Sequence, residues 1–196
     1  MRRTPAAAAA TLLIACALAL AGCSTWFDSP AKPANDAIAA ANGHMKKAVT
    51  AGTAVSEAAT RLESVPYTAA GAKDALELTT QIRADLTKQK SELEAAKAAM
   101  DSIAKLEVSA ELKSYAELEA TAVETRARLV DLGTDLYTEM DKLYSALSKG
   151  KASVPDTQKI LDRIETIKRD ITAVSELAAQ QAKAASDYFT AQKLGG

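Results

Sequence analysis

Apolar residues spaced alternately three and four positions apart recur along four long segments of this chain. In the segment before Pro66 they include Ile38, Ala41, Met45 and Ala48. This spacing places them on one face of an α-helix, as in the seam of a coiled coil. Alanine, the strongest helix former, accounts for 44 of the 196 residues. A helix with a single apolar seam is unstable alone in water, so the four segments must pack against one another.

Short breaks separate the four segments, and each break carries a helix signal. Pro66 ends the first helix, Ser109 caps the third, and Ser153 followed by Pro155 starts the fourth. Loops this short make consecutive helices antiparallel neighbours, so the sequence predicts an all-α, up-down-up-down four-helix bundle over residues 36–196. A closed monomer is favoured, and two helical hairpins that dimerise are the alternative. The expected helices span residues 36–64, 68–107, 110–149 and 154–192.

The third expected helix has two apolar stripes instead of one. One stripe repeats every seven residues and comprises Ala116, Val123, Val130, Tyr137 and Tyr144. The other fills neighbouring positions and comprises Leu129, Leu132, Leu136, Met140, Leu143 and Leu147. A face of this width predicts that the third helix contacts two partner helices.

Residues 1–22 have the features of an export signal. Arg2 and Arg3 precede an uncharged apolar run that extends from Ala6 to Ala21. This run is too short to span a membrane comfortably. We therefore expect residues 1–22 to be a signal peptide that is removed on export.

The end of this run, Leu20-Ala21-Gly22-Cys23, resembles the lipobox of bacterial lipoproteins. In that family the small residues admit the signal peptidase and the cysteine thiol receives the lipid. The resemblance implies that Cys23 becomes the lipidated first residue of the mature chain. It also implies a protein anchored on the extracytoplasmic side of the cell membrane or outer membrane. A plain secretory signal cut near Ala21 is the alternative.

Residues 23–35 form an expected flexible tether between the lipid and the bundle, kept extended by Pro30 and Pro33. It contains Trp26 and Phe27, for which three interpretations stay open. The two rings pack on the bundle, insert at the membrane interface, or belong to a mobile linker. The first interpretation follows from the short first helix, which leaves apolar residues uncovered at the end nearest the lipid: Met100, Ile103, Tyr115, Tyr188 and Phe189.

The residue inventory argues against most enzymes. The chain has one histidine, His44, and Cys16 leaves with the leader, so the only cysteine of the mature chain is Cys23. No nucleophile triad or glycine-rich phosphate loop can be assembled, and a di-metal bundle would need two Glu-x-x-His pairs. We expect no catalytic residue, no cofactor and no metal site, with His44 solvated or half-buried.

The charge pattern argues against nucleic acid as a partner. Without Arg2 and Arg3 the mature chain has 22 basic and 25 acidic side chains, a net charge of −3. In the third helix Glu117, Glu124 and Asp131 share one face. That face is either a weak divalent-cation or basic-partner surface or, as we favour, an ordinary solvated face.

Two glutamines, Gln89 and Gln181, interrupt the seams of the second and fourth helices. One interpretation is a buried polar pair that fixes the register of the helices. The favoured alternative is that both positions are locally exposed.

The last third of the chain resembles the YkyA-type family of cell-wall-binding helical lipoproteins. The likeness lies in residues 135–147, in Ile160-Leu161-Asp162-Arg163-Ile164, and in Asp187-Tyr188-Phe189. Together with the lipobox, it implies a lipid-anchored extracytoplasmic interaction or structural module of the bacterial cell envelope, without catalysis. Its expected partners are the membrane, through the anchor, and the cell wall or an envelope protein. The alternative is a ligand-binding or accessory lipoprotein of an envelope transport or stress system.

Overall fold

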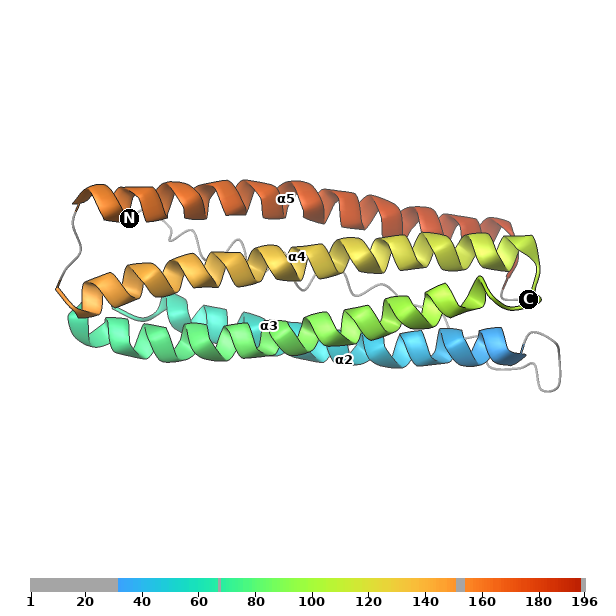
Figure 1. Cartoon of the computed structure of the whole chain (residues 1–196), viewed down its shortest axis with the longest axis horizontal. Coiled ribbons are helices and arrows are strands. Elements are labelled where there is room, and N and C mark those ends of the chain that lie inside the picture. The colour runs from blue at the N-terminus through green and yellow to red at the C-terminus, as the bar shows by residue number, and fades with distance from the viewer. Residues whose placement is uncertain (1–31, 67, 151–153, 195–196) are drawn as a thin grey trace.

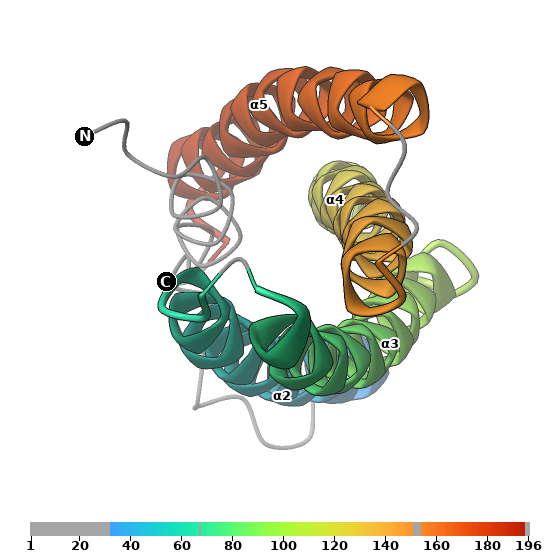
Figure 2. The same ribbon diagram turned by 90° about the vertical axis from the view of Figure 1, so that its left-hand side faces the viewer.

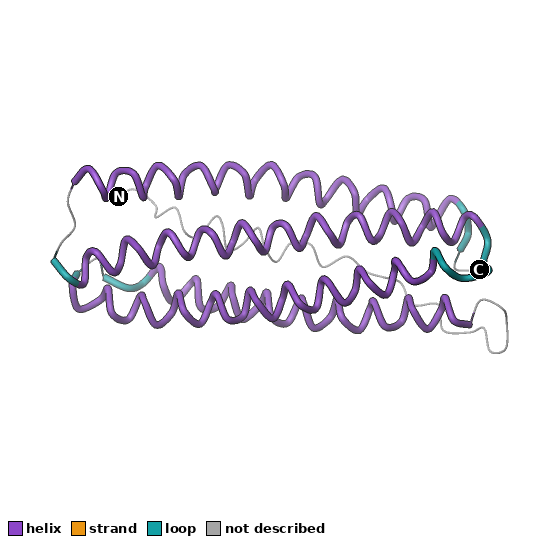
Figure 3. The backbone as a smooth tube through the Cα atoms, in the orientation of Figure 1, coloured by secondary structure: helices purple, strands orange, loops and turns teal. Residues whose placement is uncertain are grey.

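Four long antiparallel helices make up the computed structural model, which describes residues 32–66, 68–150 and 154–194. They are α2 (Lys32–Glu63), α3 (Ala69–Ile103), α4 (Ala110–Ser148) and α5 (Val154–Ala191). In Figure 1 they lie along one horizontal axis and alternate in direction, and Figure 3 shows the described loops at their ends. The predicted all-α four-helix arrangement is confirmed. None of the helices described is both long and apolar enough to cross a membrane.

The helix ends follow local rules, with one correction to the expected boundaries. α2 begins at Lys32, so residues 32–35, assigned to the tether from sequence, are its first turn. Pro33 is tolerated there because the first turn of a helix has no intrahelical partner for its backbone N–H. The predicted cap of α4 is present, since the Ser109 side chain accepts a hydrogen bond from the backbone N–H of Leu112 at 3.2 Å.

The core of the bundle consists of two separate clusters that meet on α4. The first cluster joins α2, α3 and α4, and it includes the whole seven-residue stripe of α4, from Ala116 to Tyr144. The second cluster packs Leu129 and Leu136 of α4 against Ile167 and Ile171 of α5. The prediction that this helix contacts two partners is confirmed.

Within the described part of the chain, the first and last helices of the bundle pack little against each other. Among the described residues, α5 packs substantially only against α4, and α2 only against α3 in pairwise contact. Viewed from one end, the four helices form an arc in which α5 stands apart from α2 (Figure 2). The single seam of α2 is used by the first cluster, and the single seam of α5 packs on α4.

At the end of the bundle where α2 begins, the apolar side chains are well packed. Met100, Ile103 and Tyr115 are almost fully buried, and the rings of Tyr115 and Phe189 lie 5.1 Å apart. The early start of α2 supplies one more turn at this end than the sequence predicted. Packing of Trp26 and Phe27 here stays a prediction, because both lie outside the described residues.

Because α5 packs mainly against α4 among the described helices, we expect it to unfold locally at lower cost than the other helices. Ile167→Ala removes a fully buried side chain from the second cluster, at an expected cost of about 2–5 kcal/mol. In hydrogen exchange followed by mass spectrometry, α5 should lose protection while α2 and α3 keep theirs. The matched control, Ile82→Ala in the first cluster, should lower protection in α2 and α3. Equal loss along the whole chain in both variants would show a single cooperative core.

Gly71, in the first turn of α3, and Gly43, within α2, give a paired test of helix packing. A Cβ atom added at Gly71 would lie 2.1 Å from the carbonyl oxygen of Pro66, whereas one added at Gly43 would meet nothing within 4 Å. Gly71→Ala should therefore destabilise the protein by about 1–3 kcal/mol through steric overlap. Gly43→Ala should stabilise it by about 0.5–1 kcal/mol through helix propensity. Thermal unfolding followed by circular dichroism measures both, and a shift of the same sign in the two variants would contradict this packing.

Candidate functional site

Two buried charged residues of α4 lie between the two core clusters. Glu119 and Arg126 are seven residues apart and therefore share one face of the helix. Arg126 is three residues from Val123 of the first cluster and three from Leu129 of the second. Its side chain therefore leaves α4 between the two cores, toward the interior of the arc. We call Tyr115, Glu119 and Arg126 the interior polar stripe.

Glu119 is buried, and few interactions replace the hydration that its carboxylate loses. Its side chain is 8 % exposed, and Oε1 accepts a hydrogen bond from the Tyr115 hydroxyl at 3.5 Å. Burial raises the pKa of Glu119, and the charge of Arg126 and the Tyr115 hydrogen bond oppose that rise only in part. The protonated form of this carboxyl is thus favoured more than that of an exposed glutamate.

Arg126 is a buried cation without a bonded anion. The residue is 7 % exposed, and its Nε is buried with no hydrogen-bond partner. Within the described part of the chain, no hydrogen bond or ion pair reaches its guanidinium. By contrast, buried Asp85 is paired with Lys88 at 2.8 Å. A buried charge of this kind is costly, because the guanidinium loses most of its contact with water, and only the electrostatic attraction of Glu119 offsets that loss.

The level of Arg126 in the bundle holds further unpartnered polar atoms. Asn42 Oδ1 on α2 and Ser175 Oγ on α5 are both buried without a hydrogen-bond partner. Counting along the helices from the contacts below places Asn42 level with Arg126, and Ser175 within one turn of it. The contacts that set this register are His44 Nδ1 to Glu92 Oε2 at 2.7 Å, Lys97 Nζ to Glu124 Oε2 at 3.6 Å, and the Tyr115–Phe189 ring contact.

The outer face between α3 and α4 is a shallow groove of about 570 Å³ whose charges neutralise each other. Lys90 Nζ lies 2.7 Å from Asp131 Oδ1, and Lys97 is shared between Asp101 and Glu124. The acidic row predicted on this helix therefore faces basic residues of α3 at Glu124 and Asp131. Each exposed ion pair contributes only about tenths of a kcal/mol to folding stability. We therefore interpret this groove as an ordinary solvated face.

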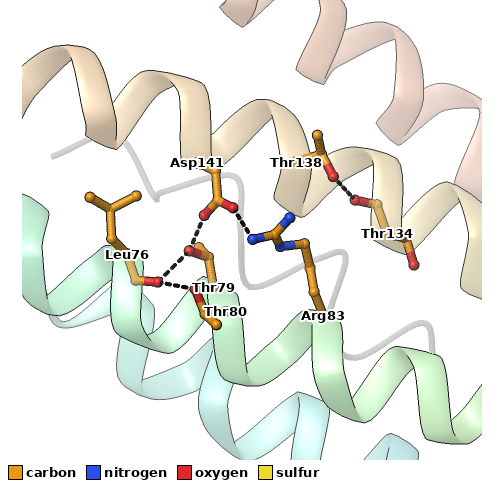
Figure 4. Close-up of polar contacts among 7 residues, drawn as sticks. All are labelled: Leu76, Thr79, Thr80, Arg83, Thr134, Thr138 and Asp141. Carbon is orange, nitrogen blue, oxygen red and sulfur yellow. Dashed lines mark hydrogen bonds and ion pairs between the residues drawn. The ribbon is translucent and has the colours of Figure 1, made fainter.

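A more buried polar contact joins α3 to α4 (Figure 4). Oδ1 of Asp141 accepts a hydrogen bond from the Thr79 hydroxyl. Oδ2 of Asp141 forms an ion pair with Arg83 Nη2 at 2.5 Å. Thr79 itself is fully buried. With both carboxylate oxygens occupied by α3, Asp141 aligns the two helices and has no chemical role of its own.

The structure describes only some of the residues that the sequence analysis singled out. Leu20, Ala21, Gly22 and Cys23 of the lipobox lie outside the described residues. His44 is half-buried, as predicted, but it is paired with Glu92 of α3, a partner that spacing within its own helix could not reveal.

The two seam glutamines do not form the pair considered from sequence. Gln89 is buried and lies against Gly52 of α2, where a Cβ atom would come 2.8 Å from Gln89 Nε2. Gln181 is half-buried on α5. The Oε1 atoms of both are buried without any hydrogen-bond partner, so neither glutamine binds the other.

Sequence reasoning missed the interior polar stripe. The signal was present, because Glu119 and Arg126 repeat at seven residues between the two apolar stripes of their helix. A count of apolar positions alone passes over such residues. Their burial depends on the packing of the other helices around α4, which spacing within one helix does not show.

The raised pKa of Glu119 gives a testable pH dependence. A carboxyl whose pKa rises on folding favours the folded state while protonated, and that contribution is lost as pH rises through the folded pKa. Glu119→Gln keeps a neutral side chain, so it should raise the melting temperature at pH 7 by a few degrees, about 2–4 °C per kcal/mol. The gain should vanish near pH 4.

The matched control for this experiment is Glu117→Gln, at an exposed position of the same turn. It should leave the melting temperature unchanged at both pH values. A Glu119→Gln variant that melts lower than the wild type at pH 7 would mean that attraction to Arg126 outweighs burial.

No protein family, curated protein or solved structure matches this chain.

Proposed function

We propose that this protein is a lipid-anchored, non-catalytic helical module of the bacterial cell envelope, attached through Cys23 and facing away from the cytoplasm. The support for the anchor is the sequence Leu20-Ala21-Gly22-Cys23 after an uncharged apolar run. A thioether-linked diacylglycerol at Cys23 supplies the membrane attachment without any spanning helix.

The support for a binding role is the unpartnered guanidinium of Arg126. It is 7 % exposed, it lies between the two core clusters, and its helix faces the side on which α2 and α5 do not pack together. A buried unpaired charge lowers the stability of the free protein, and a complementary partner would recover that loss. The side between α2 and α5 is thus the binding surface that we assign to this module.

The same observation favours a second candidate function, a ligand-binding lipoprotein that serves envelope transport or stress responses. A flat protein partner would pair most readily with exposed charges, whereas Arg126 is 7 % exposed. This candidate shares the anchor at Cys23 with the first one. The two differ in whether the occupant is an envelope protein or a small molecule.

The anchor is tested by metabolic labelling of cells with an alkyne fatty acid, followed by click chemistry to a fluorophore. The wild-type chain should be labelled, and Cys23→Ser should lose the label completely. Cys16→Ser, which changes the other cysteine, should keep it. Equal labelling of the wild type and Cys23→Ser would disprove the anchor.

A further inference from the structure

We infer that the C-terminal half of α5, residues 175–191, is a latch that detaches from α4 while the N-terminal half of the helix stays packed, with the buried charges of the interior polar stripe favouring the open state. The inference goes beyond the proposed binding role, which depends on Arg126 but does not explain how a partner reaches a side chain that is 7 % exposed. The opening is a property of α5 and is tested without any partner.

The N-terminal half of α5 is held by large apolar side chains. Four β-branched residues of this half are at most 8 % exposed: Ile164, Ile167, Ile171 and Val174. All four belong to the second cluster, together with Leu129 and Leu136 of α4. An isoleucine buries several times the apolar side-chain area of an alanine, and the free energy gained grows with that area. Residues 160–174 are therefore firmly attached to α4.

The latch packs through much smaller side chains. Its buried apolar residues are three alanines: Ala178, Ala182 and Ala185. Among the described residues, the second cluster ends at Ala178. Near the end of the latch the half-buried ring of Phe189 lies 5.1 Å from the ring of Tyr115 of α4. Apolar packing thus holds the latch less strongly than it holds residues 160–174.

Buried polar atoms further weaken the contact between the latch and α4. Ser175 Oγ and Gln181 Oε1 of the latch are buried with no hydrogen-bond partner in the described chain, as is Arg126 Nε of α4. Register from the ring contact above places Gln181 within about one turn of both charged residues of the interior polar stripe. A buried polar atom that lacks a hydrogen bond has lost its hydration without replacement. Opening the latch returns water to these atoms.

The end of the latch also touches the residues that carry the buried charges. Phe189 packs on the ring of Tyr115, and the Tyr115 hydroxyl donates a hydrogen bond to Glu119 Oε1 at 3.5 Å. Burial raises the pKa of Glu119, so its charged form is disfavoured in the closed state, and the attraction of Arg126 offsets that effect only in part. Burying two charges that do not bond to each other costs more than their attraction returns. Both side chains are better hydrated when the latch is open.

The test is native-state thiol labelling of single-cysteine variants of the chain from Ser24 onward, which contains all four described helices and no native cysteine. Ala185→Cys reports on the latch, Val174→Cys on the N-terminal half of α5, and Ala116→Cys on α4. Ala185 is the least exposed of the three residues. It lies as far from the end of α5 as Ala116 lies from the start of α4, so simple fraying of helix ends would label these two alike.

We expect a disulfide reagent to label Ala185→Cys at least about tenfold faster than either of the other two variants, each rate being divided by that of the same variant in concentrated urea. The rate should depend only weakly on low concentrations of urea, because a local opening exposes little surface. Equal rates for Ala185→Cys and Val174→Cys would show that α5 detaches as one piece. Equal rates for Ala185→Cys and Ala116→Cys would show ordinary fraying. Either result would overturn the inference.

A second experiment measures the effect of the buried charges on the opening. In the Ala185→Cys background, Glu119→Gln with Arg126→Gln removes both buried charges. The matched pair, Glu117→Gln with Arg128→Gln, removes the same charges from exposed positions of α4. The buried pair of substitutions should slow labelling by at least about tenfold, and the exposed pair should leave it unchanged. Equal effects of the two pairs, or faster labelling with the buried pair, would contradict the role assigned to these charges.

Hydrogen exchange of the chain from Ser24 without substitutions gives the same comparison, so the inference stays testable even if a variant folds poorly. Amides of residues 178–191 should exchange at least about tenfold faster than those of residues 160–174 and of residues 110–123, which lie at the same end of the bundle. Similar protection in residues 178–191 and 160–174 would disprove the latch. That result, with the Cys23 label intact, would leave the anchored module standing, and an open latch without the label would disprove the anchor alone.

Discussion

The whole arrangement depends on α4 being the one helix that contributes to both core clusters. Its seven-residue stripe packs with α2 and α3, and its leucine stripe packs with α5. The other helices have single seams, each used by one cluster. The ridge of α4 between the two stripes carries two buried charged residues, Glu119 and Arg126. Residues on this ridge are free to differ from the rest of the core, and Glu119 and Arg126 do.

The buried charge of Arg126 lowers the stability of this arrangement, and the proposed function depends on the same residue. The two cores bury enough apolar surface to hold the four helices, and the Asp141 contact with Thr79 and Arg83 keeps α3 and α4 in register. The buried guanidinium of Arg126 opposes that stability, because nothing in the described chain pairs with it. This feature lowers stability in a chain otherwise made of alanine seams and ordinary ion pairs, and the proposed binding role rests on it.

Much of the fold could be predicted from the sequence because its signals are local. The three-four spacing, the Ser109 cap and the two stripes of the third helix each depend on neighbours within a few turns. Spacing within one helix could not predict the start of α2 at Lys32 or the pairing of His44 with Glu92. Both depend on contacts with other helices. Arg126 was overlooked for the same reason. Its sequence position is that of an ordinary polar residue, and its burial depends on how the other helices pack around α4.

The opening between α2 and α5 is tested most directly by double electron–electron resonance on the chain from Ser24, which contains no native cysteine. Spin labels at Thr50→Cys and Thr172→Cys join exposed positions of α2 and α5 at nearly one level, and Asp135→Cys with Thr172→Cys gives the α4–α5 reference. We predict a broad α2–α5 distance distribution beside a narrow α4–α5 one. An α2–α5 distribution as narrow as the reference in the ligand-free protein would show a closed bundle and contradict the account.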